Sequence, residues 1–261
     1  MPANIPSGFF EWVQFLLEKY GELFFRGTIV TLEVALTGTI AGFAIGLLVA
    51  IVRTIPPNKK KTWQRVLLRL SHILLGIYIE VFRGTPMIVQ SMVIYYGLMQ
   101  LGFKMPVLGA AIFIVSINTG AYMAEIIRGG IISVEKGQKE AAVALGMTHW
   151  QGMVHVVLPQ AVRNIMPSIG NEFVVNIKDS SVLNVISVGE LFFMSKSAAG
   201  AYLRYFEVFF ITACIYLVIT FTVTRLLRVL EKKMDGKDNY TIYGSQSDSK
   251  SSIKIQEGEQ E

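Results

Sequence analysis

The sequence predicts an all-α membrane protein with about five transmembrane helices. Of its 261 residues, 52% are hydrophobic and only 16% are charged, and the mean hydropathy of +0.48 is higher than a soluble core requires. Several apolar segments reach or approach the length of about 20 residues that a helix needs to cross the hydrocarbon layer. Basic residues cluster after the first and the last of these segments, as expected of flanks that stay in the cytoplasm.

The positions of the basic residues also account for the formal net charge of +5. A basic chain can bind nucleic acid, but here the cations lie at the ends of hydrophobic segments. They are Arg53, Lys59, Lys60, Lys61, Arg65 and Arg69 after the first segment, and Arg225, Arg228, Lys232, Lys233 and Lys237 after the last. The basic excess therefore reflects membrane topology, and we expect no nucleic-acid partner.

The first predicted span covers residues 28–52, and residues 1–27 form an external N-terminal segment. Gly38, Gly42 and Gly46 recur in this span at intervals of four residues. Small residues at this spacing let two helices approach closely, either within the subunit or across a dimer. Ordinary helix packing is the interpretation that we favour.

A loop rich in proline and lysine at 56–61 is expected in the cytoplasm. The apolar stretch that follows, 66–101, is too long and too interrupted to be one span. We expect an amphipathic, partly embedded helix that leads into a second span over 87–101. Thr85 as N-cap and Pro86 as the first helical residue would start that span.

Three more segments complete the predicted crossings. A third span covers 108–127, a fourth and unusually polar one covers 151–178, and the last covers 206–227. Polar residues at membrane depth are tolerated where they line a cavity or a protein interface. A short re-entrant or external helix is expected within 179–200, and residues 231–261 form a polar cytoplasmic tail. Five crossings place the N-terminus outside and the C-terminus, with its basic flank, inside.

A short polar segment between the third and fourth spans has the features of a helix, a turn and a second helix. Ser133 is expected to cap the first helix, and Gly146 is expected in the left-handed position after its end. Thr148 and Gln151 fit a capping box at the start of the second helix. A helix-turn-helix inserted between membrane spans is a docking element for a partner on the aqueous side.

The sequence around this turn resembles the EAA loop of ATP-binding-cassette (ABC) importer permeases. In that family, Glu-Ala-Ala is followed four positions later by Gly and ten positions further on by Ile-x-Leu-Pro. The matching positions here are Glu140, Ala141, Ala142, Gly146, Val156, Leu158 and Pro159. The one departure is Val156, which stands where the family has Ile. The resemblance implies a type I ABC importer transmembrane domain, in which a loop over about 129–150 is the cytoplasmic coupling helix seated in a separate ATPase subunit.

Three further segments look like recurring motifs of the polar amino-acid permeases that include the histidine, glutamine and arginine permeases. They cover residues 83–90, 120–131 and 178–181, and Ser180 stands where family members often have Thr. The resemblance extends over the permease domain, residues 28–230. It implies a multi-pass protein of the bacterial cytoplasmic membrane that forms the pathway for a polar amino acid.

The same resemblance implies the partners. They are an ABC ATPase dimer, a second permease subunit that is identical or homologous, and an extracellular solute-binding protein. The sequence contains no glycine-rich loop that ends in Gly-Lys-Ser or Gly-Lys-Thr, so we expect no ATPase activity of its own. ATP and Mg²⁺ are expected on the partner ATPase, and no cofactor or metal is expected on this chain.

Three groups of polar residues are candidates for the substrate pathway. They are Gln90 near the start of the second span, Asn118, Tyr122 and Glu125 on one helical face, and Asn164, Ser168, Asn171 and Glu172 along the fourth segment. Glu125 or Glu172 would hold an ammonium group, and the helix start at Thr85 would face a carboxylate. The alternative is that these side chains only bond neighbouring helices or the dimer partner.

Arg83 is interpreted as structural. Its long side chain would reach the membrane interface or pair with Glu80, three residues earlier on the same helical face. Binding of an anionic substrate is the weaker alternative.

Two other classes of function compete with an ATP-driven permease. A secondary transporter would need no ATPase, but such folds commonly contain internal repeats, and the sequence has no convincing repeat. A membrane enzyme would need a nucleophile with a base, or a metal cluster. His72, His149 and His155 lack the His-Glu-x-x-His spacing of a zinc site.

Overall fold

The computed structural model describes residues 6–55 and 62–234, and these residues are helical throughout apart from short connections, as predicted. The predicted loop at 56–61 and the tail after Met234 lie outside the described residues. The elements in chain order are α1 (Phe9–Thr54), α2 (Thr62–Gly84), α3 (Met87–Gln100), α4 (Val107–Ser133), α5 (Lys136–Ala144), α6 (His149–Gly152), the π-helix η1 (Met153–Val157), α7 (Leu158–Asp179), the 3₁₀-helix η2 (Ser180–Ile186), α8 (Leu191–Tyr202) and α9 (Tyr205–Met234).

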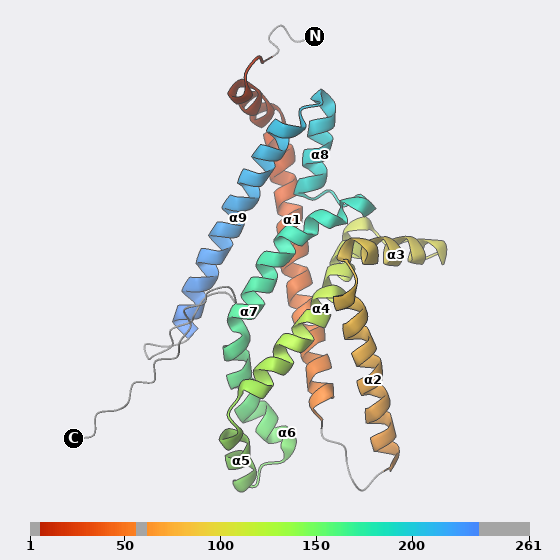
Figure 1. The fold of residues 1–261 in the computed structure, drawn as a ribbon, viewed down its shortest axis with the longest axis vertical. Helices are drawn as coiled ribbons and strands as arrows, with labels where there is room; N and C mark the ends of the chain where they lie inside the picture. The colour runs from red at the N-terminus through yellow and green to blue at the C-terminus, as the bar shows by residue number, and fades with distance from the viewer. Residues whose placement is uncertain (1–5, 56–61, 235–261) are drawn as a thin grey trace, which may run out of the picture.

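Helix α1 is much longer than the predicted first span. Its 46 residues correspond to about 69 Å, whereas the hydrocarbon layer is about 30 Å thick. The predicted span forms its second half. In the first half, Trp12, Leu16 and Phe24 are buried in a cluster with side chains of α8 and α9. The residues before the predicted span therefore belong to the folded body, at the end of the molecule where α8 lies (Figure 1).

The glycines of α1 let this helix lie directly on α4. A Cβ atom at Gly38 would be 2.5 Å from Cγ1 of Val115, and one at Gly46 would be 2.5 Å from Cβ of Met123. Such distances are too short for any side chain, so only glycine permits this approach. The structure thus confirms helix packing as the role of the glycine repeat and places it within the subunit.

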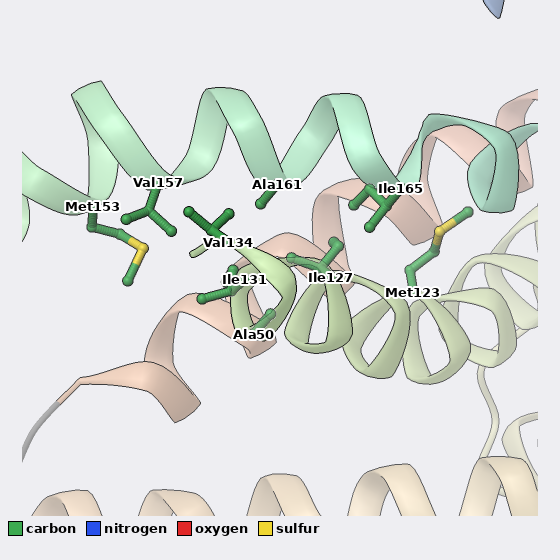
Figure 2. Close-up of a cluster of buried hydrophobic side chains, with 9 residues drawn as sticks. All are labelled: Ala50, Met123, Ile127, Ile131, Val134, Met153, Val157, Ala161 and Ile165. Atoms are coloured by element: carbon green, nitrogen blue, oxygen red, sulfur yellow. The ribbon is translucent and has the colours of Figure 1, made fainter. Parts of the chain in front are cut away.

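Helix α7 packs against both α1 and α4 (Figure 1). Figure 2 shows the buried cluster at this junction, where side chains from η1 and α7 point toward those of α4. Its members are Ala50, Met123, Ile127, Ile131, Val134, Met153, Val157, Ala161 and Ile165. Helices α1, α4 and α7 therefore form a continuous apolar centre, and each residue that the sequence placed in the third and fourth spans lies on a helix.

The break between α2 and α3 differs from the prediction. Helix α3 begins at Met87 with Pro86 as its N-cap and no capping bond from a side chain. The predicted cap, Thr85, instead donates its hydroxyl to the carbonyl of Val81, at 2.7 Å. The prediction was wrong because α2 continues to Gly84, so Thr85 bonds back to the last turn of the preceding helix.

The predicted second span over 87–101 is also wrong. Helix α3 has only 14 residues, about 21 Å, which is too short to cross the hydrocarbon layer. It runs across the direction of α2 rather than along it (Figure 1). Helix α2, with 23 residues, lies beside α1 and α4 and is the better candidate for this crossing.

Within the part of the chain that the structure describes, three helices are long and apolar enough to cross a membrane on their own, namely α1, α4 and α9. A fourth crossing results if the segment from His149 to Ile186 and α8, which meet at a bend of 56°, count as one broken span. Helix α2, with 23 residues, is about 34 Å long and so long enough for a fifth, but it is not among the helices that are apolar enough to cross alone. The count of five stays a prediction.

Candidate functional site

The loop between α4 and α7 begins differently from the prediction. Ser133 is the last residue of α4, and its hydroxyl donates to the carbonyl of Gly130 at 2.8 Å. Helix α5 has Glu135 as its N-cap, without a capping bond from that side chain. Ser133 as a cap was therefore wrong, because α4 runs to that residue and its hydroxyl bonds back into its own last turn.

The end of α5 and the start of α6 agree with the prediction. Gly146 has a φ of +76°, and its N–H donates to the carbonyl of Val143 while that of Met147 donates to Ala142. This pair of bonds is the Schellman motif that ends many helices. At the start of α6, the N–H of Gln151 donates to the Thr148 hydroxyl at 3.3 Å, and the N–H of Thr148 donates to the Gln151 side chain at 2.9 Å. Both local predictions are confirmed.

The helices α5 and α6 form a unit at the end of the molecule opposite α8 (Figure 1). Ala142 is buried in this unit, where its Cβ lies against the backbone of Gly152. Glu140, Ala141 and Gly146 are exposed. Lys139 ties α5 to α4 through a 3.1 Å bond to the carbonyl of Ile131. Of the predicted docking residues, Ala142 thus packs between the two helices, whereas Glu140, Ala141 and Gly146 lie on the surface.

The sequence did not single out three apolar side chains that are exposed on this unit. Val143, Leu145 and Trp150 expose 69%, 78% and 58% of their surfaces. They surround the turn at Gly146, and together with Glu140 they form an exposed surface that we call the coupling face. Large apolar side chains gathered at one exposed place mark a protein contact. The sequence suggested no such role because each residue also fits the apolar side of a short helix.

The unit formed by α5 and α6 continues into helix α7 without a break. Helix α6 leads through the π-helical turn η1 directly into α7. Met153 and Val157 are buried in the central cluster (Figure 2), and Leu158 packs against it. Pro159 lies at the start of α7 and is exposed. The end of the loop motif therefore packs α7 onto the central cluster, and π-helical turns of this kind are frequent at functional sites.

Two predicted pathway residues bond each other. Nδ2 of Asn118 donates to Oε1 of Gln90 at 2.8 Å, and both side chains are buried. Nε2 of Gln90 donates to the carbonyls of Phe82 and Thr85, at 2.9 and 2.8 Å. These carbonyls lie at the broken end of α2, where no helical partner is available. The pair thus supplies hydrogen bonds to the free carbonyls at the break between α2 and α3, and this supports a structural role for both residues.

Glu125 has ion-pair partners on both of its oxygens. Oε1 lies 2.6 Å from Nη1 of Arg53, and Oε2 lies 2.8 Å from Nη2 of Arg128. A carboxylate that is engaged by two guanidinium groups has little capacity left for a substrate ammonium. Of the two carboxylates considered, Glu172 is the less committed, since it is partly buried in α7 without an ion pair among the described residues.

Arg83 does not form an ion pair with Glu80 in the described part of the chain. Its guanidinium carbon lies 5.5 Å from the centre of the Tyr122 ring, within the range of a cation–π contact. It also interacts electrostatically with Glu172 of α7. Arg53, Glu80, Arg83, Glu125 and Arg128 line a polar cavity of about 200 Å³ between α1, α2 and α4.

The predicted polar face of α7 is exposed in the single subunit. Asn164, Ser168 and Asn171 point away from the buried side of the helix, which carries Ala161 and Ile165. Asn164 donates to the hydroxyl of Ser133 at 3.1 Å, whereas Ser168 and Asn171 bond no other described side chain. Unpaired polar groups in hydrocarbon cost several kcal/mol each, so this face requires water or a protein partner.

One buried polar residue of α7 was missed. Nδ2 of Asn176 donates to the hydroxyls of Thr39 and Thr119, at 2.8 and 3.0 Å, and thereby links α7 to α1 and α4. It lies off the exposed polar face, so its position in the helix gave no reason to single it out.

Comparison with known proteins agrees with this arrangement. Residues 42–236 match the family model of the binding-protein-dependent transport system inner membrane component. The chain is 35% identical to the arginine transport system permease protein ArtQ of Bacillus subtilis over 90% of its length and 97% of that protein. It is 36% identical to the glutamine transport system permease protein GlnP of Escherichia coli over 81% and 93% of the two chains.

Solved structures give the same result for the fold. The crystal structure of an amino acid ABC transporter with histidines superposes with a TM-score of 0.74 at 38% identity, and the match covers 88% of this chain and all of that one. The inward-facing MetNI methionine ABC transporter gives a TM-score of 0.69 at 19% identity, over 83% and 98% of the two chains. At that identity the second match shows the fold alone.

Proposed function

The chain belongs to the family of binding-protein-dependent transport system inner membrane components, and from this premise we propose that it forms the membrane pathway for a polar amino acid in an ABC importer. Proteins of this family are the membrane components of such importers, in which ATP is hydrolysed by a partner subunit. The named relatives are permease proteins of arginine and glutamine transport systems, and this supports the choice of substrate class.

The observation that carries the proposal is the continuity between the coupling face and α7. The exposed apolar side chains around Gly146 offer a contact for the ATPase. Helix α6, η1 and α7 form one uninterrupted helical segment from His149 to Asp179. A displacement of α6 by the ATPase would therefore move the polar face of α7 as well. ATP and Mg²⁺ belong to the ATPase in this scheme.

We place the amino acid along the exposed polar face of α7, near Asn164, Ser168 and Asn171. Among the described residues, Ser168 and Asn171 bond no other side chain and Asn164 bonds only the hydroxyl of Ser133, so these groups can bond a solute in a wet pathway. Tyr122, which lies beside Arg83, and Glu172 are second-rank candidates. Gln90, Asn118 and Glu125 rank below them because their bonding groups are already engaged.

The proposed topology has the N-terminus outside and the C-terminus in the cytoplasm. Helix α1 starts at the α8 end of the molecule, and α9 runs from that end toward the α5–α6 end (Figure 1). The basic residues at the end of α9 indicate that the α5–α6 end faces the cytoplasm. An extracellular solute-binding protein would then dock at the α8 end, and an ATPase dimer at the coupling face. A second permease subunit, identical or homologous, would cover the polar face of α7.

The test is reconstitution of the chain with its ATPase and solute-binding protein in liposomes of bacterial lipid. ATP hydrolysis is measured with binding protein loaded with arginine, histidine, glutamine or glutamate, and with leucine as an apolar control. We expect at least one polar amino acid to raise hydrolysis several-fold and to accumulate in the lumen, while leucine does neither. Accumulation that proceeds without ATP, or hydrolysis that no polar amino acid changes, would contradict the proposal.

A further inference from the structure

A groove between α7 and α9 lies outside the coupling face and the polar cavity. Its volume is about 260 Å³, and three of its lining residues are cations, Lys178 from α7 and Arg225 and Arg228 from α9. No acidic side chain lines it. In the described part of the chain these cations have no ion-pair partner. The two carboxylates nearby, Asp179 and Glu231, lie outside the lining.

The arginine side chains are arranged to receive an anion. The guanidinium carbon of Arg225 lies 4.9 Å from the centre of the Phe221 ring. This distance is within the range of a cation–π contact, and guanidinium N–H groups match the oxygens of a phosphate. Arg228 follows three residues later on the same helical face, so both groups line one side of the groove.

The rest of the lining consists of three apolar side chains and two threonines, Thr220 and Thr224. Val174, Leu217 and Phe221 form the part of the groove that lies toward the middle of α9. The arginines lie one to three turns further along, at the basic end of this span. Helices α7 and α9 run in opposite directions, and Gly170 of α7 packs against Leu227 of α9, so Lys178 lies at the Leu217 end of the groove, opposite the arginines. Along α9 the lining changes from apolar to cationic, as a phospholipid changes from acyl chain to phosphate. An amino acid fits poorly, because its ammonium would meet a cation at either end of the groove and no lining carboxylate.

We propose that this groove binds an anionic phospholipid, with its phosphate at Arg225 and Arg228 and an acyl chain against Leu217 and Phe221. The proposal is independent of which amino acid is carried. Basic pockets between transmembrane helices are known to hold anionic headgroups, and along α9 the apolar side chains and the arginines occur in the order that such a lipid requires.

The test measures lipid binding to the purified complex by native mass spectrometry. The probes are phosphatidylglycerol, phosphatidylcholine with the same acyl chains, and free glycerol 3-phosphate. We expect the complex to prefer phosphatidylglycerol to phosphatidylcholine, and the double variant Arg225→Gln, Arg228→Gln to lose that preference by roughly fivefold per cation removed. The charge-conserving variant Arg225→Lys, Arg228→Lys should retain most of it, which separates loss of charge from loss of fold.

The matched control is Lys232→Gln with Lys233→Gln, which removes two exposed cations from the same end of α9 outside the groove. It should keep the preference for phosphatidylglycerol. An equal loss in the control would mean general surface attraction and would overturn the proposal. If free glycerol 3-phosphate bound as tightly as phosphatidylglycerol, the groove would be a site for anions in general, and the proposal of a lipid site would be overturned. A groove variant that dissociates the permease pair but keeps its lipid preference would identify the groove as a subunit interface instead.

Discussion

Nδ2 of Asn118 on α4 lies 2.8 Å from Oε1 of Gln90 on α3, although 28 residues separate the two in the chain. Gln90 in turn donates to the carbonyls of Phe82 and Thr85 at the broken end of α2. The pair therefore closes a buried break that would otherwise leave polar backbone groups unsatisfied. This supports a structural role for Asn118 and Gln90.

The first prediction concerns this pair. Asn118→Leu and Gln90→Leu should each lower the free energy of unfolding by roughly 1–3 kcal/mol, because each leaves buried polar groups without partners. The double variant should lose less than the sum of the two, since they share one bond. Melting temperatures of the purified complexes measure this. If melting is unchanged while uptake per complex is lost, the two residues contact substrate after all.

The second prediction tests the contact between α1 and α4. Gly46→Ala should destabilise the protein by roughly 1–3 kcal/mol, because its Cβ would lie 2.5 Å from Cβ of Met123 and 2.8 Å from the backbone N of Ala124. The control is Gly21→Ala in the same helix, where the added Cβ would meet no neighbouring atom within 4 Å. The control should be neutral or slightly stabilising, because alanine favours the helix. Equal melting temperatures for the two variants would refute close packing at Gly46.

The third prediction concerns the turn between α5 and α6. Gly146→Ala should strain that turn by roughly 1–2 kcal/mol, because a side chain disfavours the left-handed conformation seen at its φ of +76°. We expect weaker stimulation of the ATPase by loaded binding protein, with normal assembly. Gly146→Asn should be milder, since asparagine tolerates this conformation.

The control for the turn is Gly137→Ala within α5, where a Cβ meets nothing within 4 Å and φ is not positive. It should leave ATPase stimulation unchanged. If Gly146→Ala also leaves it unchanged, the shape of the turn is not needed for coupling.

The residues around this turn illustrate what the sequence can predict. The Schellman turn at Gly146 and the capping box of Thr148 and Gln151 each involve residues a few positions apart, so the local sequence suffices to specify them. The caps at Ser133 and Thr85 were wrong for a different reason. Each depends on where the preceding helix ends, and both helices continue to or next to the predicted cap.

The candidate pathway shows the same limit. The sequence placed Asn118, Glu125 and Asn171 on polar helical faces, and the structure agrees that each lies on a helix. It did not reveal that Asn118 meets Gln90 or that Glu125 meets Arg53, which is 72 residues away. Such pairs arise from the packing of α1 to α4 and cannot be seen in the spacing of residues along one helix.

The fourth prediction separates Glu125 from Glu172. Glu125→Gln leaves Arg53 and Arg128 without their shared carboxylate, so the melting temperature should fall by roughly 2–4 °C, as for a loss of about 1 kcal/mol in a chain of this size. The preference among amino acids should not change. Glu172→Gln should change that preference more than it changes melting. Uptake competition beside thermal melting measures both, and a change of preference in Glu125→Gln alone would reverse the assignment.

We propose that the amino acid passes along the exposed face of α7, the same helical segment that leads to the coupling face. The decisive measurement is uptake per assembled complex in Asn171→Leu, with Val175→Leu as the control that adds bulk on the same side without removing an amide. We expect a large loss of uptake in Asn171→Leu, with normal melting and normal ATPase assembly, and near-parental uptake in the control. Parental uptake per complex in Asn171→Leu, or a loss of assembly and melting temperature with normal turnover in the complexes that remain, would contradict it.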